Sequence, residues 1–173
     1  MKKENIKFAE EKIKEYFNIV EKINLLNNLI ISLEEKKEIL KDKNRNLQLD
    51  FNIDIKSIVI NDMPKSNGDG TSYFESNIMK QIQNNERMIE KIEEDILNQK
   101  DEIFRLEIKN EKMKNIINII RNDYKDLLMF RYHNNMSELE IAMKLNISTA
   151  QYQRNKKKMI SSIYNLLVMQ REI

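Results

Sequence analysis

The only proline and both glycines of this 173-residue chain lie close together, at Pro64, Gly68 and Gly70. These residue types most often end helices and form turns, so the long stretches on either side contain nothing that forces a break. All-β and α/β folds need many turns and far more of these residues. The sequence therefore predicts an all-α protein, with two helical regions joined by a loop at about residues 50–73.

A long helix is predicted from residue 3 to about 49. Its apolar residues recur at steps of three and four, the spacing of one helix face, at Ile6, Ala9, Ile13, Tyr16, Val20, Ile23, Ile30 and Leu33. Other apolar residues widen this face beyond a two-helix seam, at Phe17, Ile19, Leu26, Leu29 and Ile31. We expect apolar surface to remain on this helix after one partner helix is placed against it.

The stretch that follows reads as a connection. Phe51, Ile53 and Ile55 alternate with polar residues, so a short extended segment is one interpretation. Acidic and amide side chains in residues 62–70 have neither the spacing of an EF-hand nor the lysine of a phosphate-binding loop. A plain surface loop is the preferred interpretation of residues 62–70.

A second long helix begins after a predicted capping box at Ser72 and Glu75. It carries a heptad repeat sustained well beyond the length needed to indicate a coiled coil. One seam position holds Ile82, Ile89, Ile96, Ile103, Asn110, Ile117 and Tyr124, and the other holds Ile78, Asn85, Ile92, Gln99, Leu106, Met113, Ile120 and Leu127. The polar seam residues weaken the seam but favour one register.

Two long helices joined by one loop most simply form an antiparallel helical hairpin, because the loop makes their pairing intramolecular. We expect residues 1–120 to form this coiled-coil hairpin and residues 121–173 to form a second domain. The wide apolar face of the first helix predicts that a second copy of the chain covers it. The chain is therefore expected to be a homodimer through the helical hairpin.

The C-terminal part has the pattern of a helix-turn-helix. Ser137 with Glu140 forms one capping box, and Ser148 with Gln151 forms a second. Between them Asn146 can adopt the left-handed backbone that ends a helix. A break near residues 121–123 is expected to separate the long second helix from a supporting helix. The residues predicted to face inward are Tyr124, Leu127, Leu128, Tyr132, Ile141, Ala142, Leu145, Tyr152, Met159, Ile160 and Ile163.

Charge points to one function for this part of the chain. Residues 121–173 carry 9 Lys and Arg against 5 Asp and Glu, although the whole chain has a net charge of only +2. No acidic residue occurs between Ile141 and Arg171. The basic residues in that stretch are Lys144, Arg154, Lys156, Lys157, Lys158 and Arg171. A helix that lies against DNA phosphates has this composition.

Other classes of function find little support in the sequence. The chain has no cysteine and a single histidine, His133, which is predicted to be exposed or to cap a helix. Neither a glycine-rich phosphate loop nor a carboxylate pair in an apolar setting is present, so we expect no enzyme, no cofactor and no metal. The N-terminus does not resemble a signal peptide, and no apolar run suffices to cross a bilayer. A cytoplasmic protein that does not associate with membranes is expected.

The stretch DLLMFRYHNNMSELEIAMKLNISTAQYQRNKKKMISSIYNLL resembles region 4 of sigma-70 factors, the helix-turn-helix that reads the promoter −35 element. The whole layout is more similar to the small phage and prophage sigma-like regulators of the ArpU/RinA type. Their loop signature corresponds here to residues 62–66, and their sigma-like motif to Phe130–Tyr132 and Ser137–Ser148. No segment resembles the sigma-factor region that melts promoter DNA.

The resemblance implies transcription regulation of phage or prophage genes, often late ones, by binding double-stranded DNA. It places Thr149, Ala150, Gln151 and Arg154 at the base edges, and Gln153, Lys157 and Lys158 along the phosphates. RNA polymerase is a further candidate partner. Asn155 and Met159 depart from the family, which more often has an apolar residue and an alanine at these positions.

Two functions stay open from the sequence. The first is a sequence-specific DNA-binding transcription regulator that activates such genes without opening promoters by itself. The second is a coiled-coil assembly or DNA-packaging protein that uses its helix-turn-helix non-specifically.

Overall fold

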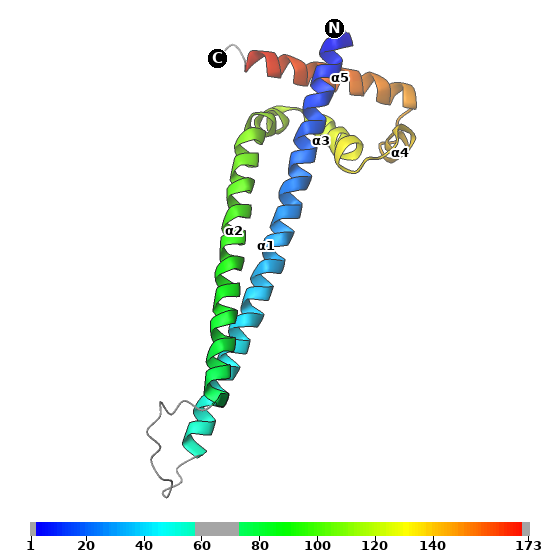
Figure 1. Cartoon of the computed structure of the whole chain (residues 1–173). Coiled ribbons are helices and arrows are strands. Elements are labelled where there is room, and N and C mark those ends of the chain that lie inside the picture. The colour runs from blue at the N-terminus through cyan, green and yellow to red at the C-terminus, as the bar shows by residue number, and fades with distance from the viewer. Residues whose placement is uncertain (1–2, 58–72, 171–173) are drawn as a thin grey trace, which may run out of the picture. The chain divides into compact units, whose positions relative to one another are not determined.

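The computed structural model describes residues 3–57 and 73–170, and the side chains of 3–49 and 75–170. Throughout these residues the regular secondary structure is helical (Figure 1). The elements are α1 (Lys3–Ser57), α2 (Tyr73–Ile119), α3 (Asn122–Leu128), the π-helical turn η1 (Met129–His133), α4 (Glu138–Lys144) and α5 (Thr149–Met169). The prediction of an all-α protein is confirmed.

Helix α1 continues past its predicted end near residue 49 and reaches Ser57. The extended segment considered at Phe51, Ile53 and Ile55 is therefore wrong, and so is a loop that begins at residue 50. The alternation is short, and no glycine or proline precedes Pro64, so nothing in residues 50–57 ends the helix. The predicted loop signature at 62–66 and the predicted cap at Ser72 lie outside the described residues.

The chain divides into two compact units. One comprises Met1–Leu25 with Ile103–Ile173 and is called the terminal unit below, and the other comprises Leu26–Glu102 and is called the middle unit. Ile120 and Leu127 lie on either side of the expected domain boundary at residues 120–121, yet both belong to one buried cluster of the terminal unit. A separate domain made of residues 121–173 stays a prediction.

In the middle unit, α1 and α2 run antiparallel. Asn85 Nδ2 donates to Asn44 Oδ1 at 2.7 Å. Lys37 Nζ lies 3.6 Å from Glu93 Oε1. From Lys37 to Asn44 the residue numbers of α1 rise, whereas those of the α2 partners fall from Glu93 to Asn85. The two segments therefore run in opposite directions. Asn44 is itself 9% exposed, so the amide pair is largely shielded from water.

The pattern of burial along α2 follows the heptad prediction. Every residue at the two predicted seam positions between Ile78 and Ile117 is buried or half-buried. The polar seam residue Asn110 is 6% exposed, and its Nδ2 donates to the backbone oxygen of Tyr16 at 3.1 Å. The heptad spacing therefore identified the inward face of α2 correctly.

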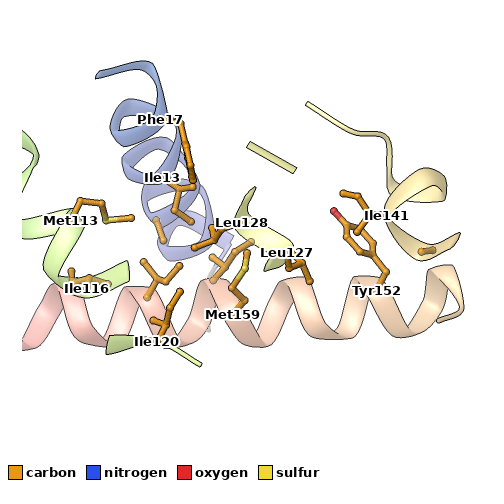
Figure 2. Packing of buried hydrophobic residues seen from close by; sticks show 14 residues of the cluster. Ile13, Phe17, Met113, Ile116, Ile120, Leu127, Leu128, Ile141, Tyr152 and Met159 are labelled. Carbon is orange, nitrogen blue, oxygen red and sulfur yellow. The ribbon is translucent and has the colours of Figure 1, made fainter. Parts of the chain in front are cut away.

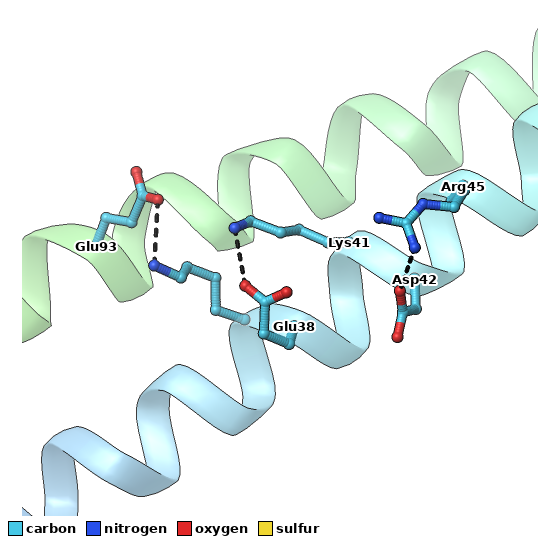
Figure 3. A network of polar contacts seen from close by, with 6 residues as sticks. Glu38, Lys41, Asp42, Arg45 and Glu93 are labelled. Atoms are coloured by element: carbon cyan, nitrogen blue, oxygen red, sulfur yellow. Dashed lines mark hydrogen bonds and ion pairs between the residues drawn. The ribbon is translucent and has the colours of Figure 1, made fainter.

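Charged pairs also line the exposed side of α1 in the middle unit. Lys41 Nζ lies 2.9 Å from Glu38 Oε1, and Arg45 Nη1 lies 3.1 Å from Asp42 Oδ1 (Figure 3). The hydrogen bond from Lys41 lowers the pKa of Glu38 below its ordinary value. Exposed pairs of this kind contribute little stability, because water screens them and long side chains must be ordered to form them.

The main hydrophobic core lies in the terminal unit. Side chains from α1, α2, α3, α4 and α5 contribute to it (Figure 2). Its buried members are Ala9, Ile13, Phe17, Met113, Ile116, Ile120, Leu127, Leu128, Ile141, Ala142, Tyr152, Met159, Ile160 and Ile163. The predicted inward residues of the C-terminal part belong to this cluster or pack against it. Fully burying one such aliphatic side chain contributes roughly 1.5–3 kcal/mol, so this cluster fixes how the short helices sit on α5.

The predicted break after the second helix is confirmed. Helix α2 ends at Ile119 and α3 begins at Asn122. The guanidinium of Arg121 binds the carboxylate of Asp123, with Nη2 2.8 Å from Oδ2. Lys125 Nζ donates to the backbone oxygen of Asn118 at 2.9 Å, across the break. This bend allows α3 and η1 to support α4 and α5.

Candidate DNA-binding surface

The candidate site is built on α4 and α5, and the first of these begins with a complete capping box. The backbone N–H of Glu140 donates to Ser137 Oγ at 3.3 Å, and the backbone N–H of Ser137 donates to Glu140 Oε2 at 2.7 Å. The hydrogen bonds from Ser137 lower the pKa of the Glu140 carboxyl. The predicted start of this helix is therefore confirmed in its atomic detail.

The turn after α4 is fixed by a residue in the left-handed region. Asn146 has a φ of 53°. Its N–H donates to Met143 O at 3.2 Å, and the N–H of Ile147 donates to Ala142 O at 3.0 Å. This pair of bonds is the Schellman motif, which satisfies the last carbonyls of a helix and turns the chain sharply. The prediction made for Asn146 is confirmed.

Helix α5 begins with only half of the predicted capping box. Ser148 Oγ accepts from the backbone N–H of Gln151 at 3.1 Å. The side chain of Gln151 does not return to Ser148, because its Nε2 donates to Asn155 Oδ1 at 3.1 Å. Asn155 lies one helical turn further along and offers an acceptor on the same face. The reciprocal bond expected from the sequence is thus replaced by a side-chain pair.

Helices α4 and α5 contact each other through small and apolar residues. Ile141 and Ala142 of α4 are buried, and so is Tyr152 of α5. Ala142 brings little bulk to the contact. Among the described residues the hydroxyl of Tyr152 has no hydrogen-bond partner. Burial raises the pKa of this hydroxyl, so it stays protonated at neutral pH.

Two of the cations in the acid-free stretch are engaged by the protein itself. Lys144 Nζ lies 4.3 Å from the centre of the Phe130 ring, a cation–π distance. Lys156 Nζ lies 3.2 Å from Glu10 Oε1 and 4.0 Å from Glu138 Oε1. The side chain of Lys156 is only 19% exposed. Both lysines therefore make contacts within the protein, Lys144 with η1 and Lys156 with α1 and the start of α4.

Three other cations point to solvent. Arg154, Lys157 and Lys158 are exposed on α5. They are spaced three and four residues apart, so they share one side of the helix; we call them the basic face. Within residues 3–49 and 75–170, whose side chains the structure describes, none of these three side chains has an ion-pair or hydrogen-bond partner. Their positive charge is thus uncompensated by nearby carboxylates.

The other predicted contact residues have different surroundings. Thr149 and Ala150 are exposed at the start of α5, and Gln151 is half-buried beside Asn155. Gln153 is exposed, but its Nε2 donates to Glu138 Oε2. The structure therefore brings all seven predicted residues to the first half of α5, with Gln153 already bonded to an acid of α4.

Sequence reasoning missed the part that α1 plays beside α5. Glu10 binds Lys156 and also accepts a hydrogen bond from Tyr132 Oη at 3.3 Å. The ring of Tyr132 is stacked on Phe17, with centroids 6.3 Å apart and planes 9° from parallel. Burial, reinforced by the charge of Glu10, raises the pKa of Tyr132. The only available signal was the apolar spacing around Ala9 and Ile13, which marks a buried face but names no partner.

His133 lies at the end of η1 and is exposed. Its ring centroid is 6.0 Å from that of Phe17. Among the described side chains of residues 3–49 and 75–170, His, Asp and Glu nowhere form a group of three that could hold a metal ion. In the same residues, each helix is too short or too polar to cross a membrane.

Comparison of the chain with protein-family models, with curated proteins and with solved structures gives no match in any of the three.

Proposed function

We propose that this protein is a sequence-specific DNA-binding transcription regulator, in which α4, the turn at Asn146 and α5 act as a helix-turn-helix. The observation that carries the proposal is the basic face, Arg154, Lys157 and Lys158, which is exposed and lacks acidic partners among the described residues. Uncompensated cations on one helix face attract DNA phosphates and release counterions on binding. The capped start and the Schellman end of α4 are the local geometry that a tight turn between two such helices requires.

The proposed contacts divide between bases and phosphates. With α5 in the major groove, its N-terminal residues Thr149, Ala150 and Gln151 face base edges together with Arg154. Arg154 matches the two acceptors of guanine, and Gln151 matches the donor and acceptor of adenine. Lys157 and Lys158 contact phosphates, which position the helix without reading sequence. Gln153 joins them only if its bond to Glu138 is exchanged for one to DNA.

We further propose that α1 and α2 form a long antiparallel helical hairpin that makes the protein a homodimer. Leu25 and Leu29 of α1 are 63% and 44% exposed, and Phe104 and Ile108 of α2 are 63% and 56% exposed. Exposed apolar side chains repeated along a helix favour burial against another chain. A two-fold dimer presents two copies of α5 to two half-sites.

The regulatory part of the proposal rests on the resemblance to sigma-70 region 4 and to the ArpU/RinA-type regulators. A protein of this kind acts in the cytoplasm, where DNA and RNA polymerase are present, and activates genes without melting the promoter itself.

A second function is favoured by the same exposed apolar residues of α1 and α2. A coiled-coil assembly or DNA-packaging protein also needs extended helices with uncovered apolar side chains. Such a protein uses its basic face for contacts that do not depend on base sequence.

Selection of bound sites from a pool of random duplexes tests the proposal. The purified full chain is mixed with the pool, bound duplexes are separated, amplified and sequenced, and the cycle is repeated. Enrichment of one motif with two related halves supports a dimeric regulator. Retention of duplexes without any enriched motif, together with large assemblies in sedimentation, supports the second function. Failure to retain duplex DNA at about 50 mM salt overturns both, because phosphate contacts are strong at such ionic strength.

A further inference from the structure

A polar cleft of about 480 Å³ lies in the terminal unit. It is lined by Glu10, Lys14, Asn18, Arg131, Tyr132, Asn135 and Lys156, so it combines residues of α1, η1, the turn after η1 and α5. We propose that this cleft binds a phosphate group. The inference does not depend on the helix-turn-helix, because neither Arg154 nor Lys157 nor Lys158 lines the cleft.

The charges around the cleft favour an anion. Lys14, Arg131 and Lys156 bring three positive charges, and Glu10 is the only acidic residue in the lining. Lys156 is already paired with Glu10, at 3.2 Å. Lys14 is exposed and, in the described part of the chain, has no ion-pair partner. The cleft therefore keeps an excess of positive charge after its internal pair is formed.

Several hydrogen-bond donors of the cleft are uncommitted. The guanidinium of Arg131 uses Nη1 to donate to Met136 O at 2.9 Å, which orients the group and leaves other N–H donors available. The side chains of Asn18 and Asn135 have no hydrogen-bond partner among the described side chains of residues 3–49 and 75–170. Asn135 also has a φ of 51°, and this left-handed backbone sets where its side chain leaves the turn. Tetrahedral oxyanions readily accept hydrogen bonds from cationic groups that lie beside amide donors.

The size of the cleft also fits a small ligand. Small-molecule sites commonly have volumes of about 300–1,000 Å³ and are mostly apolar. This cleft lies in that size range but is lined by charged and amide side chains, so the chemistry of its ligand must be polar and anionic. A phosphate group could come from a free phosphorylated molecule or from the backbone of bound DNA.

Titration of the full chain with inorganic pyrophosphate, at constant ionic strength set by chloride, tests the proposal by calorimetry. We expect saturable binding that weakens about 2- to 5-fold in Lys14→Gln, the loss expected for one exposed charge pair. Glu10→Gln should strengthen binding, because it removes the one negative charge of the lining and leaves Lys156 only its longer contact with Glu138, at 4.0 Å. Lys36→Gln, which changes an exposed lysine of the middle unit, is the matched control and should bind like the parent.

The outcomes separate clearly. Equal binding by the parent, Lys14→Gln and Lys36→Gln overturns the proposal, and so does the absence of saturable binding by the parent. Lys14 is exposed, so its variant retains the fold, which circular dichroism checks; the result does not rest on Glu10→Gln alone.

Duplex binding by Lys14→Gln then identifies the source of the phosphate. If the slope of log K against log salt falls by about one unit and pyrophosphate competes with the duplex, the phosphate belongs to the DNA backbone. Unchanged duplex binding, with weakened pyrophosphate binding, assigns it to a free phosphorylated molecule. Pyrophosphate binding that weakens in Lys14→Gln but not in Lys36→Gln, while the parent binds no duplex, supports the cleft and overturns only the proposed function.

Discussion

Neighbouring lysines of α5 have opposite surroundings. The side chain of Lys156 is 19% exposed and paired with Glu10, whereas Lys157 is exposed and has no partner among the described residues. One residue step rotates the side chain by roughly 100° around a helix, which carries it from the core side to the solvent side. Composition alone counts both residues as members of one basic run. Only the fold shows that their surroundings differ.

Lys157→Ala is expected to weaken binding to all duplexes equally. A phosphate contact carries no sequence information, so its loss should reduce the slope of log K against log salt by about one unit. Fluorescence anisotropy at several salt concentrations measures this slope. Lys36→Ala serves as the control, and a slope that is the same in both variants contradicts a phosphate contact by Lys157.

Glu15 provides a residue-scale prediction about pH. Hydrogen bonds from Lys109 and Lys12 lower the pKa of Glu15 to about 2, although burial acts in the opposite direction. Because the folded pKa lies below the unfolded value, Glu15 stabilises the fold above about pH 4.5 and loses this contribution as the pH falls towards 2. Glu15→Gln should therefore lower stability at pH 7 by up to about 1 kcal/mol, since the pair is partly exposed.

Urea denaturation at pH 7 and at pH 2.5 measures this difference. The difference in the free energy of unfolding between the parent and Glu15→Gln should be smaller at the lower pH. A gap of equal size at both pH values shows that the carboxylate charge is not responsible.

The ends of the short helices decide the geometry of the α4–α5 pair. Asn146 holds the left-handed position, and two backbone bonds at 3.2 and 3.0 Å close the turn around it. A residue with a β-carbon is destabilised in this conformation unless its side chain, like that of asparagine, can form a local hydrogen bond.

Asn146→Ala is expected to destabilise the protein by about 1 kcal/mol, the usual cost of placing such a residue in the left-handed region. Asn146→Gly should cost little, because glycine adopts this backbone freely. Thermal or urea unfolding of the two variants checks the prediction. Equal stability of both variants argues against strain at this turn.

At the level of elements, much of the structure was predictable from spacing and caps. The three- and four-residue steps from Ile78 to Ile117 identified the buried face of α2, because a helix repeats its faces with that period. Ser137, Asn146 and Glu140 predicted the limits of α4, since their backbone bonds are local. The end of α1 was missed because alternation at Phe51–Ile55 resembled a strand, whereas the uninterrupted helix before it simply continued.

Contacts between distant residues were not predictable. No local pattern links Glu10 to Lys156, or Phe17 to Tyr132, because these contacts depend on how α1 lies against η1 and α5. For the same reason the polar cleft, which takes residues from both ends of the sequence, was not found. Gln151 was expected to accept from the Ser148 N–H and cap α5, but its side chain instead donates to Asn155 Oδ1 one turn further along, a pairing that the capping pattern does not specify.

At the scale of the whole molecule, the ends of the sequence meet in one unit. Met1–Leu25 and Ile103–Ile173 share a core, so the first turns of α1 contribute to the same body as the candidate DNA-binding helices. Ala9 and Ile13 are fully buried there. A fragment that begins at residue 121 lacks these contacts, and the intact chain is the proper material for binding experiments.

Association of two copies is a prediction at this scale. The double variant Leu25→Glu, Leu29→Glu places charge on the exposed apolar side of α1 and should shift the protein from dimer to monomer in analytical ultracentrifugation. Leu139→Glu is the matched control, because Leu139 is 60% exposed but belongs to α4. Parent protein that is monomeric at micromolar concentration, or a double variant that still forms dimers, contradicts the proposed dimer surface.

The most direct test of the DNA-binding account is a titration of the intact parent and of Arg154→Ala with a selected duplex and with a random one. On the selected duplex, loss of a paired contact to guanine should weaken the binding free energy by about 1–3 kcal/mol. On the random duplex, only the attraction between one positive charge and the phosphates should be lost. The account predicts that the parent prefers the selected duplex and that Arg154→Ala largely loses this preference. A parent that binds neither duplex at about 50 mM salt, or an Arg154→Ala variant with unchanged preference, contradicts it.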